Sequence, residues 1–182
     1  MKLFKMITNF VLAAAITLAL IPAAFAASSN TNVTLKAGPF TISPITVGNF
    51  GQIILNGQDQ TAQASISNFT VTDARGNSKG WSVQISATRF ASGKNLLHDG
   101  ALTISGTTGA AVGHSDSFEK SYIFNPTKIT TVPSKYIVVP NSKGKGTFNF
   151  SGGILTLDIW PNEVLEGTYT STVTIDVVAN IN

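Results

Sequence analysis

The residue types of a hydrolase triad stand side by side at His114-Ser115-Asp116. Neighbouring residues of an extended chain point to opposite sides, whereas the members of a triad come from distant segments. No G-x-S-x-G turn, which would expose a serine nucleophile, accompanies the run. The three residues therefore indicate a solvated loop rather than a nucleophilic site.

Carboxylates offer a second possible chemistry. Glu163 and Glu166 lie close to Asp158 in the chain, and a glycosidase needs two carboxyls about 5–10 Å apart across a cleft. Nothing in the sequence specifies such a cleft. His98 precedes an Asp-Gly pair, which is typical of a turn rather than of a catalytic base and its partner. The chain has no cysteine and two histidines, which excludes thiolate sites and disfavours a multi-histidine metal site. We therefore predict a protein that is not an enzyme and that needs no metal or cofactor.

Trp160 is the residue best suited to binding a ligand. It follows the alternation of Thr156 and Asp158 on a polar face and precedes Pro161, where a strand would end. An exposed indole is costly unless something covers it. Trp160, with Asp158 and Tyr136, is thus a candidate platform on which a sugar ring could stack. The alternative, which the sequence leaves open, is that Trp160 caps one end of the fold.

A mild basic cluster lies in a probable loop at Lys143-Gly144-Lys145. Its charges could contact the phosphates of an anionic polymer, although a solvated hairpin turn is the simpler interpretation. The chain has 12 basic and 9 acidic residues, a net charge of +3. This small excess does not favour a nucleic-acid partner, because nucleic-acid-binding proteins gather their basic residues on one face.

Alternating hydrophobicity predicts that strands position these side chains. Apolar and aromatic residues occupy one face, and Thr, Ser or Asp the other, over four segments: 33–37, 81–88, 155–160 and 169–177. The threonines suit exposed strand positions, and they could also line a glycan-binding surface.

Turn residues separate the strands, and no long helical pattern lies between them. We therefore predict an all-β fold, an antiparallel β-sandwich that forms a single domain over residues 33–182. Residues 107–117 are expected to form a long mobile loop, and residues 161–166 are the one place for a helical turn.

Residues 1–26 have the three parts of a secretory signal peptide. Two lysines stand at the start, an almost wholly apolar run follows, and Ala24-Phe25-Ala26 gives an A-x-A cleavage pattern. The apolar run is short for a membrane helix, which needs about 20 residues. We expect cleavage after Ala26, a flexible start over 27–32, export, and no membrane span in the mature chain.

Four short motifs resemble, in their order, the WxL domain of secreted surface proteins of low-GC Gram-positive bacteria. They are Asn49-Phe50-Gly51, Val71-Thr72-Asp73-Ala74-Arg75-Gly76, Gly80-Trp81-Ser82-Val83 and the closing run Gly167-Thr168-Tyr169-Thr170-Ser171-Thr172-Val173-Thr174. The resemblance spans roughly 40–180. It implies non-covalent attachment to peptidoglycan at the cell surface, with the W-x-L motifs implicated in binding.

The motifs depart from the family pattern in an informative way. The first W-x-L reads Trp81-Ser82-Val83, and the second has Ile175 at its Trp position and Val177 at its Leu position. Each of these residues shares its strand face with aliphatic neighbours, which is typical of core positions. We therefore expect all four to be core residues, with direct ligand contact as the alternative.

The sequence thus favours a secreted, non-catalytic cell-surface protein that binds the Gram-positive cell wall, through peptidoglycan or another wall polymer. The alternative is a structural subunit of an extracellular assembly, which would contact other secreted proteins through strand edges or exposed patches.

Overall fold

A computed structural model of the protein describes residues 28–180. The predicted signal peptide lies outside the described residues. Residues 28–35 have no regular secondary structure, and Val33 and Leu35 are exposed. The strand predicted over 33–37 is therefore wrong: the residues alternate, but no neighbouring strand pairs with them. No helix within 28–180 is long and apolar enough to cross a membrane.

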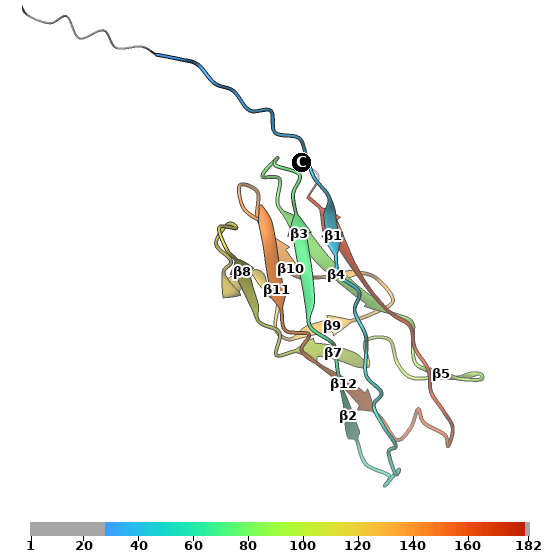
Figure 1. The fold of residues 1–182 in the computed structure, drawn as a ribbon. Coiled ribbons are helices and arrows are strands. Elements are labelled where there is room, and N and C mark those ends of the chain that lie inside the picture. The colour runs from blue at the N-terminus through green and yellow to red at the C-terminus, as the bar shows by residue number, and fades with distance from the viewer. Residues whose placement is uncertain (1–27, 181–182) are drawn as a thin grey trace, which may run out of the picture. The chain divides into compact units, whose positions relative to one another are not determined.

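The rest of the described chain is built from short strands, with one 3-10 turn (Figure 1). In chain order the elements are β1 (Phe40–Ile42), β2 (Gln60–Ser65), β3 (Phe69–Asp73), β4 (Trp81–Ala87), β5 (Ala91–Ser92), β6 (Asn95–Leu96), β7 (Leu102–Ser105), β8 (Gly109–Val112), η2 (Lys120–Tyr122), β9 (Thr127–Ile129), β10 (Ser134–Val139), β11 (Gly146–Phe150), β12 (Ile154–Ile159) and β13 (Val173–Ala179). The strands pair antiparallel in the orders β1-β3-β11-β8, β2-β12-β7-β9, β10-β4-β13 and β5-β6.

The two four-stranded sheets are halves of one bent sheet. The segment β2–β3 pairs with β11–β12 in an unbroken register, from Gln60 opposite Ile159 to Asp73 opposite Gly146. The segment β7–β8 pairs with the other side of β11–β12, also in one register, from Leu102 opposite Leu157 to Val112 opposite Thr147. The named strands of all three segments are interrupted together at 66–68, 106–108 and 151–153, which we call the crease.

Two glycines allow the crease to form. A Cβ on Gly152 would lie 1.8 Å from the carbonyl oxygen of Ile66, and Gly153 has a φ of +88°. Both positions therefore exclude larger side chains. Inside the fold, the buried Thr107 hydroxyl donates to the Gly152 carbonyl at 3.1 Å and hydrogen-bonds the Tyr136 hydroxyl. This buried network ties the crease to strand β10.

The sheet β10-β4-β13 forms the second layer, and the core lies between the layers. Along β4, Trp81, Val83 and Ile85 are fully buried. The Trp81 indole reaches across to β11, with ring centroids 5.5 Å from Phe148 and 6.3 Å from Phe150. The predicted all-β, antiparallel sandwich is confirmed, and so is the prediction that this face of β4 is core.

Some predicted boundaries differ from the structure. Part of the expected loop over 107–117 is strand β8, because Gly109–Val112 complete the sheet beside β11. Residues 161–166 form turns rather than a helical turn, and the short 3-10 helix is η2 instead. Strand β13 begins at Val173, four residues later than predicted.

Candidate functional site

Trp81, the tryptophan of the first W-x-L motif, holds a loop from inside the core. Its exposure is 0%, and its Nε1–H donates to the carbonyl oxygen of Gly144 at 2.9 Å. Gly144 has a φ of +90°, and a Cβ there would lie 2.5 Å from the indole nitrogen. The indole therefore positions the loop that carries Lys143 and Lys145, and it is not available to a ligand.

The second motif packs beside the first. On β13, Val177 lies opposite Val83 of β4, and Ile175 lies opposite Ile85. Ile175 and Val177 are half-buried and pack against the core, since β13 is an edge strand of its sheet. The two motifs are thus cross-strand neighbours, and their apolar side chains contribute to one layer of the sandwich.

The Asp73-Ala74-Arg75-Gly76 run closes the turn that leads into β4. The Asp73 carboxylate is buried and accepts hydrogen bonds from Arg75 Nε at 2.9 Å and Nη2 at 2.7 Å. Arg75 also donates to the Gly80 carbonyl and stacks on Phe40. Burial opposes ionisation, but the hydrogen bonds and charge of Arg75 outweigh it, so the pKa of Asp73 is lowered. This motif is therefore structural.

Trp160 is exposed at the end of β12, and its indole is held in place. Its exposure is 42%. The His98 ring stacks on it with centroids 3.7 Å apart and planes 14° apart. His98 is fixed by Glu163, whose Oε2 accepts from the His98 backbone N at 2.9 Å and contacts His98 Nδ1 at 2.8 Å. We call these three residues the Trp160 platform.

The Glu163 carboxylate also interacts electrostatically with its neighbours. Burial tends to raise the pKa of Glu163, but hydrogen bonds from His98 and the charges of His98 and Arg89 outweigh it, and the net pKa is lowered. Glu163 also closes a turn, because its backbone N donates to the Trp160 carbonyl at 3.1 Å. The carboxylate therefore links the turn that carries the indole to the histidine that supports it.

The other two residues predicted for the platform differ in their positions. Asp158 is half-buried on β12, two residues before Trp160, where its backbone N donates to the Ala101 carbonyl. Tyr136 is fully buried, so the prediction that it belongs to an exposed platform is wrong. The register between β10 and β4 shifts between Lys135 and Ile137, and this bulge adds Tyr136 to the buried residues of β10. Burial raises the pKa of its hydroxyl.

The basic loop lies away from the platform. Lys143 and Lys145 precede β11, whereas Trp160 follows β12, so the β11–β12 segment lies between them. Lys143 Nζ donates to Ser117 Oγ at 3.3 Å. The backbone of Lys145 exchanges two hydrogen bonds with Asp116, one to its carboxylate and one from its amide. These lysines form no common site with the indole.

The His114-Ser115-Asp116 run is tied to this same loop. Ser115 Oγ donates to the Val112 carbonyl at 2.6 Å and accepts from the Thr147 backbone N at 2.8 Å. His114 is exposed. These contacts anchor a loop, as the sequence predicted, and they are not those of an activated nucleophile.

His98 and Glu163 were not predicted as partners of Trp160. They are 65 residues apart, and neither stands in a motif. His98 belongs to the loop before β7, which meets the end of β12 only because the two strands pair. His98 and Glu163 could be predicted as neighbours only if the pairing of β7 with β12 were already known.

Comparisons with known proteins give the family. No curated protein and no solved structure matches the chain. A family model described as "WxL domain surface cell wall-binding" matches residues 22–180, which include both motif strands and Trp160. The match covers most of the 182 residues. The chain therefore belongs to the WxL domain family of surface cell wall-binding proteins.

Proposed function

We propose that the protein is exported, stays at the surface of a Gram-positive cell and binds peptidoglycan non-covalently, without catalysing a reaction. Membership of a wall-binding family supports binding at the cell surface. The observation that carries the rest of the proposal is the Trp160 platform, an exposed indole fixed by His98 and Glu163.

The geometry suits stacking of a sugar ring. His98 covers one face of the indole, and the residue keeps 42% of its surface exposed, so a sugar would stack on the opposite face. A saccharide presents C–H groups from one face of its ring, and an aromatic face is their natural partner. Because the indole is already held in place, binding does not need to order it, which favours affinity.

The motif residues support binding through the fold. Trp81 and Val83 are buried and shape the sandwich, while Gly144 accepts the indole hydrogen bond and fixes the basic loop. We therefore assign contact with the wall to exposed residues, Trp160 first among them, and not to the buried motif.

The test is co-sedimentation of the purified chain with peptidoglycan stripped of proteins and anionic polymers. Trp160→Ala should fold normally and bind about tenfold more weakly, as expected when a central aromatic contact is removed. Phe124→Ala is the matched control, because Phe124 is an exposed aromatic residue, 50% exposed, outside the platform. Equal sedimentation of wild type and Trp160→Ala would contradict the proposal.

Walls free of other proteins also separate this function from the alternative. A structural subunit of a surface assembly would sediment only when its partner proteins remain on the wall.

A further inference from the structure

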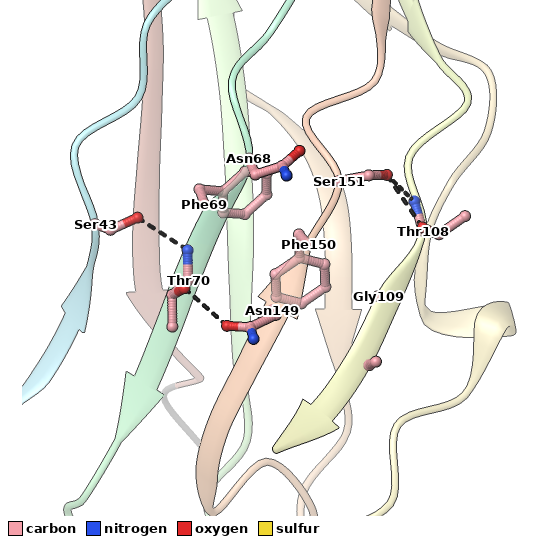
Figure 2. Close-up of a pocket in the computed structure, with 10 residues that line it drawn as sticks. Ser43, Asn68, Phe69, Thr70, Thr108, Gly109, Asn149, Phe150 and Ser151 are labelled. Atoms are coloured by element: carbon pink, nitrogen blue, oxygen red, sulfur yellow. Dashed lines mark hydrogen bonds between the residues drawn. The ribbon is translucent and has the colours of Figure 1, made fainter.

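The crease carries a pocket on its outer face, with a volume of about 450 Å³ (Figure 2). Its size falls within the range of small-molecule sites. Six hydrogen-bonding side chains line it: Ser43, Asn68, Thr70, Thr108, Asn149 and Ser151. Beneath them lie the buried rings of Phe69 and Phe150, stacked with centroids 5.0 Å apart.

Strand β8 creates the hollow because its residues there are small. Gly109 and Ala110 pair with Phe150 and Asn149 of β11. A Cβ on Gly109 would lie 2.6 Å from atoms of both Phe118 and Phe150, so the rings require glycine. Ala110 is exposed and extends only one carbon above the sheet. The space beside Asn149 is therefore left open by the sequence of β8.

Two amide groups of the pocket keep free donors. The Asn149 side-chain oxygen accepts from the Thr70 hydroxyl at 2.9 Å, and the Asn68 side-chain oxygen accepts from the Gly152 backbone N at 3.3 Å. Within residues 28–180, neither amide nitrogen donates a hydrogen bond to the protein. The bonded oxygens fix the orientation of both amides, and each leaves an N–H₂ group for a ligand.

The pocket contains no charged side chain. A charged ligand would lose hydration there without gaining a counter-charge, which disfavours phosphates, carboxylates and ammonium groups. Uncharged hydroxyls and amides instead match the hydroxyl and acetamido groups of an N-acetylated sugar. The acetamido carbonyl in particular needs N–H donors.

We propose that the crease pocket binds one uncharged N-acetylated sugar residue through the amides of Asn68 and Asn149. The inference rests on the proposed function, since it adds a second contact for the same glycan. Trp160 lies nine positions after Ser151 in the chain, at most about 30 Å away. A glycan strand can thus contact the crease and the Trp160 platform together, and two linked contacts bind more tightly than either alone.

The experiment uses the full chain, expressed with its own N-terminal segment and recovered from the medium, and chitohexaose as the probe. In ¹⁵N spectra, the side-chain amide signals of Asn68 and Asn149 should shift on titration. Ala110→Tyr fills the pocket from an exposed strand position and should weaken binding by about tenfold. Val112→Tyr, on the same strand and face but outside the pocket, is the matched control.

Asn149→Asp gives an isosteric second test that does not depend on filling space. The variant keeps the oxygen that accepts from Thr70 but replaces the free donor with an acceptor, so chitohexaose affinity should fall about fivefold or more. Chitohexaose that does not bind, unmoved amide signals at saturation, or unchanged affinity in Asn149→Asp would each overturn the inference.

The two proposals can fail separately. If Trp160→Ala loses wall binding while Ala110→Tyr and Asn149→Asp bind chitohexaose as wild type does, the proposed function stands and the crease inference falls. If Trp160→Ala sediments normally while the amide signals respond to chitohexaose, the crease is a glycan site and the assignment to Trp160 is wrong.

Discussion

Replacing Trp81 with Phe separates a structural role of the W-x-L motif from a direct role in binding. The smaller ring loses the hydrogen bond from Nε1 to Gly144, a buried residue. Leaving a buried acceptor without its partner costs about 1–3 kcal/mol. The space vacated between Phe148 and Phe150 adds about 1–2 kcal/mol, since full truncation of a buried aromatic costs about 3–5 kcal/mol.

The variant should therefore be destabilised by about 2–5 kcal/mol, and its Tm should fall by about 5–15 °C. Urea unfolding followed by far-ultraviolet circular dichroism measures this loss without depending on indole fluorescence, and the m-value should not change. Trp160→Phe is the matched control and should change stability by less than about 0.5 kcal/mol, because Trp160 is exposed. Wild-type stability in Trp81→Phe together with lost wall binding would instead place the indole at the ligand.

Three further predictions concern the residues that shape the fold and the platform. Asp73→Asn should lower stability by about 1.5–3 kcal/mol in urea unfolding, because the part-buried Arg75 guanidinium loses its charged hydrogen-bond partner. Since the pKa of Asp73 is lowered, the wild-type contribution should be complete above about pH 4 and disappear as the pH falls through the folded-state value below 3.8. Gly152→Ala should cost about 3 kcal/mol or more in thermal unfolding, because its Cβ would clash with the Ile66 carbonyl; a stable variant would show that the crease is not fixed by this contact. Glu163→Gln should weaken wall co-sedimentation while leaving the Tm nearly unchanged, since it loosens His98 on the surface; undiminished binding would show that the indole needs no support.

Alternation along the strands was sufficient to predict the layers. Trp81, Val83 and Ile85 repeat every second residue on a strand between two others, where both pairing and burial agree with the pattern. The same pattern fails at Val33 and Leu35, because alternation describes a strand's faces and not whether another strand is present to pair with it.

The composition of the candidate sites depends on strand register, which local sequence patterns do not reveal. Tyr136 became a core residue through a bulge, which adds one residue to β10 and changes its inward-facing set. The crease pocket depends on an unbroken register across three segments, which turn residues such as Gly152 and Gly153 do not reveal by themselves. Sequence therefore identified Trp160 as exposed, while the structure was needed to find what surrounds it.

The most direct test compares Trp160→Ala and Trp81→Phe in one sedimentation experiment on purified peptidoglycan, at a temperature where circular dichroism shows that both are folded. Trp81→Phe should sediment with the wall as wild type does, whereas Trp160→Ala should stay largely in solution. Retention of Trp160→Ala on the wall, with folded Trp81→Phe left in the supernatant, would show that the W-x-L indole and not Trp160 contacts the wall.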